Sequence, residues 1–116
     1  MGADTKLKAA LETLHPVART HYKVKKGSNA PRTYFTFQLI LGAEALHADD
    51  ESGAGVSTWR IDLASRDNYA ELIPKVVKAL KDAQFYGITI EAEQYDPETD
   101  YYRISLNAKY FIMEEN

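Results

Sequence analysis

Residues 56–84 decide the fold, and they read VSTWRIDLASRDNYAELIPKVVKALKDAQ. The first part alternates, because Trp59, Ile61 and Leu63 fall on one face of a strand while the residues between them are polar or charged. The second part has the period of a helix whose apolar stripe is Tyr69, Leu72, Ile73, Val76, Val77 and Leu80. A strand over Val56–Leu63 followed by a helix over Ser65–Gln84 is therefore predicted.

The predicted helix has candidate residues for both of its ends, but it also has a proline in its interior. Ser65 or Asp67 can cap its start, and Gly87 is expected to mark its end. Pro74 lies inside the pattern and costs about 3 kcal/mol in a helix interior. We therefore expect a kink at Pro74, or a regular helix that starts only near Asn68.

The N-terminal half predicts one helix and two strands. The helix spans Asp4–Leu14, with Asp4 as its N-cap, and His15-Pro16 ends it because a residue before proline avoids helical dihedrals. A short strand follows over Val17–Val24, and the Lys/Gly/Ser/Pro composition of residues 25–31 indicates a loop. Arg32–Leu41 is the clearest strand of the chain.

The rest of the chain predicts one long connection and a hairpin. Gly42–Gly55 is Ala/Gly-rich and acidic, which favours a long loop or a loose hairpin extension. Strands over Gly87–Tyr95 and Tyr101–Ile112 are joined by a turn at Asp96–Asp100, where Pro97 presets φ. The order α-β-β-β-α-β-β predicts an α+β fold, mostly antiparallel, with two helices packed on one face of the sheet.

Composition sets the class of protein. The chain has 116 residues and a net charge of −3, which predicts a single domain over residues 1–116 and argues against a nonspecific nucleic-acid coat. It has no cysteine, which excludes disulfides and thiolate chemistry. No apolar run approaches the ~20 residues that span a bilayer, and no signal-peptide core is present. We expect a small, soluble, intracellular domain without membrane contact.

Candidate catalytic and metal sites are weak. The three histidines lack partners at helical ligand spacing, and Ser52-Gly53-Ala54-Gly55 is no nucleophile elbow. The run His47-Ala48-Asp49-Asp50-Glu51 offers a divalent-cation site but lacks the ligand spacing of a calcium loop. The carboxylates of residues 91–100 are expected to form an exposed polar hairpin. We expect no enzyme, no cofactor and no metal.

The tyrosine content and the order of charges along the chain say more about possible partners than the candidate catalytic and metal sites do. Eight tyrosines favour surfaces with one wet side, although packing at sheet edges explains any one of them equally well. Residues 19–32 contain five basic and no acidic residues, and residues 91–100 contain five acidic and no basic ones. The basic stretch beside Tyr22 and Tyr34 suits single-stranded nucleic acid, whereas positive and negative ends suit head-to-tail packing of subunits into a ring.

The sequence resembles the tail terminator, or tail completion (head–tail joining), proteins of long-tailed phages. The resemblance lies in Thr58–Ser65, which leads into a helix, in His15–Ala18, in the aromatic strand Thr33–Phe37, and in Gly87–Ile90 followed by Asp96–Asp100. The helix carries the apolar stripe Ala70, Leu72, Val76, Val77, Ala79 and Leu80. The resemblance covers nearly the whole chain, and it lies in the order of the elements and in their residue pattern. It includes no diagnostic motif.

This resemblance implies a structural virion protein. Tail terminators form hexameric rings that cap the tail tube, stop its polymerisation and present a surface to the head connector. The implied partners are the tail tube protein, the head connector or completion protein, and further copies of the chain, which can stay monomeric until assembly. The implied location is the head–tail interface of the virion, with the host cytoplasm as the place of assembly.

Interface residues follow from the charged loops. We expect Lys23, Lys25, Lys26 and Arg32 to contact an acidic surface on a neighbouring subunit or ring. We expect His47, Asp49, Asp50 and Glu51 to lie on a loop that orders on assembly. A solvated loop explains any one of these residues as well. The alternative functions are a small binding module for nucleic acid or a small ligand, and a small enzyme whose only candidates are His47 and its acidic loop.

Overall fold

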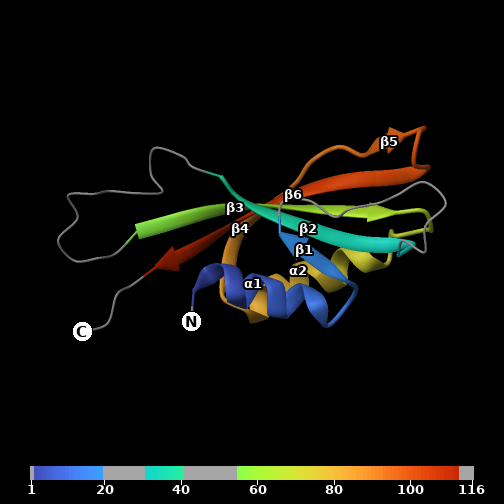
Figure 1. Ribbon diagram of the computed structural model, residues 1–116. Helices are drawn as coiled ribbons and strands as arrows, with labels where there is room; N and C mark the ends of the chain where they lie inside the picture. The colour runs from blue at the N-terminus through green and yellow to red at the C-terminus, as the bar shows by residue number, and fades with distance from the viewer. Residues whose placement is uncertain (1, 20–30, 41–54, 113–116) are drawn as a thin grey trace.

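One sheet with two helices against a single face forms the part of the chain that the structure describes (Figure 1). This computed structural model describes residues 2–19, 31–40 and 55–112. Its elements are α1 (Ala3–Glu12), β1 (Val17–Arg19), β2 (Thr33–Ile40), β3 (Gly55–Ser65), α2 (Leu72–Asp82), β4 (Phe85–Ile90), β5 (Gln94–Asp96) and β6 (Tyr101–Ile112). The predicted α+β class, with mostly antiparallel pairing, is confirmed.

The strand order is β1-β2-β3-β6-β4, and β5 pairs with β6 as well. β3 and β6 are the long central strands, antiparallel from Gly55 opposite Ile112 to Ser65 opposite Tyr102. β1 is the exception to antiparallel pairing, because it runs parallel to β2 with Val17 opposite Phe35. The described chain is elongated, with extents of 50 × 24 × 23 Å.

The core lies between the helices and the sheet. From the strands, Phe35, Ile61, Leu63 and Leu106 are fully buried, as the period-two pattern predicts. Both helices contribute fully buried residues to the same cluster, which are Leu7, Leu11, Val76 and Leu80. Figure 1 shows α1 and α2 side by side beneath the sheet. The other face of the sheet has no helix against it in the described chain, so we call it the open face.

The second helix is shorter than its apolar stripe predicts. It begins at Leu72 rather than at Ser65 or Asn68, and Pro74 is its third residue. The backbone N–H groups in the first turn of a helix have no acceptor within the helix. A proline in that turn therefore costs no helical hydrogen bond, and no kink is needed. Ser65 belongs to β3, where its hydroxyl lies 2.8 Å from the hydroxyl of Thr33 and accepts a bond from the backbone N–H of Asp67. Because β3 pairs with both neighbouring strands up to Ser65, this residue belongs to a strand and cannot start the helix.

The helix also ends before Gly87. Its last residue is Asp82, and Gln84 takes the left-handed conformation after it, with φ of 75°. Gly87 lies within β4 instead, with φ of 59°, where the register with β6 shifts between Tyr86 and Thr89. A positive φ in a strand suits glycine, which has no Cβ to clash. Gly87 therefore marks a β-bulge and not the end of the helix.

Two further boundaries differ from expectation, and a third lies partly outside the described residues. The first helix has Gly2 at its N-cap, so Asp4 lies in its first turn, where a carboxylate suits the helix dipole. The single strand expected over Gly87–Tyr95 is two strands, β4 and β5, which adds one β to the predicted order. Of the strand expected over Val17–Val24, the structure describes Val17–Arg19 as β1, and the remainder lies outside the described residues.

A second, smaller cluster lies on the open face at one end of the sheet. It consists of Tyr34, Ala64 and Tyr101, all buried, with the two tyrosine rings 5.2 Å apart in an edge-to-face arrangement. The hydroxyl of Tyr101 donates to the backbone oxygen of Pro31. This cluster fixes the chain just before β2 against the start of β6, and it positions Arg32 in space.

Candidate assembly surfaces

Arg32 is the one predicted interface residue that lies within the described ranges. It precedes β2, and its guanidinium forms a two-point contact with Asp67: Nε lies 2.9 Å from one carboxylate oxygen and 3.1 Å from the other. The hydrogen bond to this carboxylate raises the pKa of Arg32, and the same bond lowers the pKa of Asp67. Both side chains are more than half exposed. Arg32 therefore offers a neighbour an arginine–aspartate pair, not an isolated cation.

The other predicted interface residues are Lys23, Lys25, Lys26, His47, Asp49, Asp50 and Glu51, and they lie outside the described residues. The strand ends that flank residues 41–54 are nevertheless placed. Thr33 pairs with Ser65 at the Arg32 end of the sheet, whereas Ile40 pairs with Thr58 at the opposite end. Ile40 and Gly55, the described residues on either side of residues 41–54, thus belong to strands β2 and β3 at the end of the sheet opposite Arg32.

Arg19 is also paired within its own chain. Its guanidinium lies 3.1 Å from the carboxylate of Asp4. It also lies 6.0 Å from the ring centroid of Phe37 and 5.7 Å from that of Trp59. Both described arginines of the basic stretch, Arg19 and Arg32, therefore help to hold elements of the fold together.

The acidic hairpin lies at the same end of the sheet as Arg32. Arg66, which follows β3, donates from Nε to the backbone oxygen of Thr99 at 3.0 Å. Asp100 lies close enough to contribute to the raised pKa of Arg32. The expectation of a positive loop at one end and a negative hairpin at the other is therefore wrong for Arg32.

The hairpin turn is well ordered by its own side chains. Asp96 accepts hydrogen bonds from the backbone N–H of Glu98 at 3.0 Å and from the hydroxyl of Thr99 at 2.9 Å. These bonds, first the one from Thr99, lower the pKa of Asp96. Asp100 has φ of 64° and accepts a bond from the hydroxyl of Tyr95. These bonds arrange the carboxylates of Asp96 and Asp100 as in a capped turn.

A polar network crosses the middle of the open face. Arg60 on β3 donates from Nε to Asp62 at 3.3 Å and from a terminal nitrogen to the hydroxyl of Ser105 at 3.0 Å. The hydroxyl of Ser105 on β6 in turn donates to the carboxylate of Asp62. Sequence reasoning placed these residues on polar strand faces but missed the network. The signal was the alternation, and the missing information was the register of β3 with β6.

The tyrosines divide between packing and surface. Tyr34 and Tyr101 are buried, whereas Tyr86, Tyr95 and Tyr102 are 43%, 48% and 39% exposed. Phe111, near the end of β6, is 48% exposed. Tyr86 pairs with Lys109, and Phe111 pairs with Val56. Lys109 and Val56 lie on the side of their strands that faces away from the helices, so Tyr86 and Phe111 lie on the open face. Apolar surface of this kind is typical of contact with other proteins.

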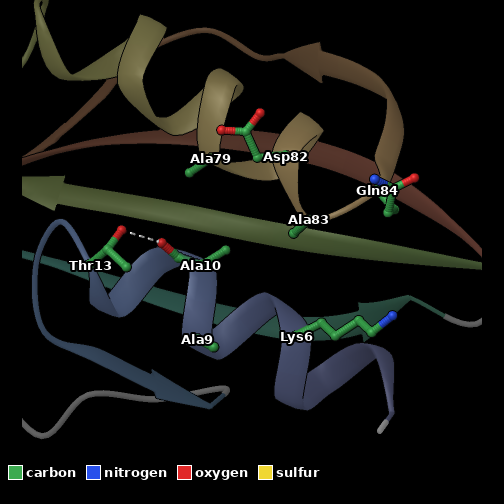
Figure 2. A pocket seen from close by; sticks show the side chains of 8 residues that line it. All are labelled: Lys6, Ala9, Ala10, Thr13, Ala79, Asp82, Ala83 and Gln84. Atoms are coloured by element: carbon green, nitrogen blue, oxygen red, sulfur yellow. Dashed lines mark hydrogen bonds between the residues drawn. The ribbon is translucent and has the colours of Figure 1, made fainter.

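A groove of about 510 Å³ lies between the two helices (Figure 2). Its lining residues are Lys6, Ala9, Ala10, Thr13, Ala79, Asp82, Ala83 and Gln84. The four alanines give it an apolar floor, while the ammonium of Lys6 lies 2.6 Å from the hydroxyl of Tyr110. This lining places no nucleophile beside a base.

Within residues 2–19, 31–40 and 55–112, no group of three or more His, Asp or Glu side chains is arranged to hold a metal ion. No helix among the described residues is long and apolar enough to cross a membrane.

Comparisons with known proteins identify a shared fold. No family model matches the sequence, and no curated protein matches it significantly. A solved protein structure without a descriptive name aligns at a TM-score of 0.52 and 12% identity, covering 100% of this chain and 99% of its own. This likeness shows that the fold occurs elsewhere over the same length, and at this identity it shows the fold alone.

Two further solved structures align less closely. One is a chain from the virion of a native gene transfer agent particle, at a TM-score of 0.47 and 19% identity, covering 97% of this chain and 87% of that one. The other is a protein of Akkermansia muciniphila, at a TM-score of 0.41 and 12% identity, covering 71% of this chain and 42% of that one. At these TM-scores the two likenesses carry no argument about function.

Proposed function

We propose that the chain is a structural, non-catalytic virion protein of the tail terminator type. In this proposal, copies of the chain form a ring, hexameric as in tail terminators, that caps the tail tube and joins it to the head connector. Its partners are then the tail tube protein, the head connector protein and other copies of itself. Its location is the head–tail interface, after assembly in the host cytoplasm.

The observation that carries the proposal is the asymmetry of the sheet. Two helices bury one face, while the open face carries a hydrogen-bonded network at Arg60, Asp62 and Ser105 and exposed aromatic side chains at Tyr86 and Phe111. Aromatic side chains beside fixed polar groups are typical of the composition of protein interfaces. The resemblance of the sequence to tail terminators supports the tail tube as the assembly that this surface serves.

A tube-elongation assay tests this function. Purified tail tube protein from the same source genome is allowed to polymerise with and without the chain, and tube lengths are measured by electron microscopy. We expect substoichiometric chain to stop elongation, because each ring blocks one growing end. Tubes that reach the same lengths at every ratio would contradict the proposal.

The second candidate function, a nucleic-acid binding module, rests on the basic stretch 19–32. The structure weakens its simplest form, because Arg19 and Arg32 are paired with Asp4 and Asp67. Retention on single-stranded DNA that falls steeply with salt would favour this candidate. We expect weak retention at physiological salt, since the net charge of the chain is −3.

A further inference from the structure

The hairpin formed by β5 and the start of β6 has two unlike faces. Tyr101 and Tyr102 are successive residues of β6, so their side chains point to opposite sides. Tyr101 is fully buried, and the guanidinium of Arg66 lies 4.3 Å from its ring centroid. On this side the chain itself places a cation over a tyrosine ring and fixes that cation by its bond to the backbone oxygen of Thr99.

The other side of the hairpin is exposed. Tyr95 and Tyr102 pair across the strands, with ring centroids 4.8 Å apart, and they are 48% and 39% exposed. Two carboxylates lie near these phenols: Asp100 accepts from the hydroxyl of Tyr95, and Glu93 accepts from the hydroxyl of Tyr69, which lies close enough to Tyr102 to interact with it electrostatically. We call Tyr95, Tyr102, Glu93 and Asp100 the tyrosine surface.

The chemistry of the tyrosine surface selects a cationic partner. A tyrosine ring attracts an ammonium or guanidinium placed over its face, and the attraction grows when contact excludes water. Each of the two carboxylates uses one hydrogen bond to a phenol and retains acceptor sites for a further donor. Residues 91–100 contain five acidic residues, Glu93 and Asp100 among them, and no basic residue. A lysine-bearing segment therefore fits both the rings and the carboxylates.

We propose that the tyrosine surface is the docking site for the basic segment 19–32 of a second copy of this chain. The argument is charge complementarity within one sequence, because that segment carries five basic and no acidic residues. Its two arginines are paired with Asp4 and Asp67 of their own chain, which leaves Lys23, Lys25 and Lys26 as its remaining cations. The inference deepens the proposed ring and rests on it.

In the proposed ring such a contact is heterologous, because the tyrosine surface and the basic segment are different parts of the chain. Each copy then offers its tyrosine surface to one neighbour and its basic segment to the other. Repeated contacts of this type close into a ring when the rotation between copies permits.

Zero-length crosslinking tests the contact. Carbodiimide joins an amine directly to a carboxylate, so only groups in contact react. Equal amounts of unlabelled and 15N-labelled full-length chain are mixed at high concentration and crosslinked, and the products are analysed by mass spectrometry. We expect mixed-isotope crosslinks from Lys23, Lys25 or Lys26 to Glu93 or Asp100. Crosslinks found only within single-isotope pairs, or none between these groups, would overturn the proposal.

Charge exchange sharpens the test. Sedimentation over a concentration series measures self-association of Lys25→Glu/Lys26→Glu, of Glu93→Lys, and of the triple variant. We expect each reversal to weaken association by about tenfold or more, and the triple variant to recover most of the loss. Glu71→Lys, an exposed change of the same type before α2, is the matched control and leaves association unchanged. If the triple variant does not recover association, or if Glu71→Lys weakens association as much as the other reversals do, the proposed pairing is wrong.

The outcome is separable from that of the proposed function. A chain that stops tube elongation but shows no such crosslinks and no effect of charge exchange retains its function, and its ring uses another surface. A chain that shows the crosslinks but never affects tubes retains the docking surface, and the tail terminator proposal fails.

Tyr95→Leu/Tyr102→Leu, which removes both ring faces and keeps the carboxylates, is expected to weaken association as well.

Discussion

The two faces of the sheet differ in what their side chains do. On the helix-covered face, Phe35, Ile61 and Leu63 are fully buried against α1 and α2 (Figure 1). On the open face, Arg60 and Asp62, which alternate with them along β3, are bound into a polar network and stay partly exposed. Folding free energy therefore comes mainly from the helix-covered face, where the apolar side chains are removed from water.

The largest expected difference between the faces is at Trp59. Its side chain is 4% exposed among the core residues, and its indole N–H donates to the hydroxyl of Ser57 at 2.9 Å. We expect Trp59→Ala to lower the free energy of unfolding by about 3–5 kcal/mol, measured by urea denaturation. Arg60→Ala, one residue away on the open face, is the control and costs much less. Equal losses at the two positions would abolish the distinction between the faces.

A smaller effect is expected within the open-face network. Asp62→Asn keeps the shape of the side chain but removes the charge that Arg60 and Ser105 contact. We expect a loss of about 1 kcal/mol in the free energy of unfolding, typical of one hydrogen bond, since solvent reaches the network. A loss as large as that of Trp59→Ala would mean that the open face supports folding as much as the core does.

The smallest effect at neutral pH concerns Tyr69, at the margin of the covered face. Burial first, and then its hydrogen bond to Glu93, raises the pKa of Tyr69 to about 12. Unfolded tyrosine titrates near 10, so the folded state holds this proton more tightly. The stability that Tyr69 contributes is therefore complete below about pH 10 and is lost as the pH rises towards 12.

An absorbance titration of tyrosinate checks this shift. The difference between the titration curves of the native chain and of Tyr69→Phe isolates the phenol of residue 69. We expect the midpoint of that difference near 12. A midpoint near 10 would show that the covered face does not extend over this residue.

The covered face could be predicted from the sequence, and the open face only in part. The period-two pattern at Trp59, Ile61 and Leu63 is local, so it identified the buried face of β3 without any knowledge of its neighbours. The start of α2 was predicted wrongly, because Ser65 is held by pairing with Thr33 and Tyr102, which are distant in sequence. Long-range pairing overrode a helical pattern that was locally consistent.

The candidate site was harder for the same reason. Tyr101 and Tyr102 are adjacent and chemically identical, yet one is buried under Arg66 and the other is exposed. Nothing local separates them, since the difference depends on the face that each takes in the sheet. Arg32 stands out in the sequence as a charged residue just before a strand, but its pairing with Asp67 requires the fold.

Electron microscopy of tube ends is the sharpest test of the proposal that the chain caps a tail tube. Purified chain is added to assembled tail tubes from the same source genome, and tube ends are imaged in negative stain. We expect a ring-shaped density at one end of each tube and none along the sides. Bare tube ends at saturating chain, together with salt-sensitive retention on single-stranded DNA, would contradict it.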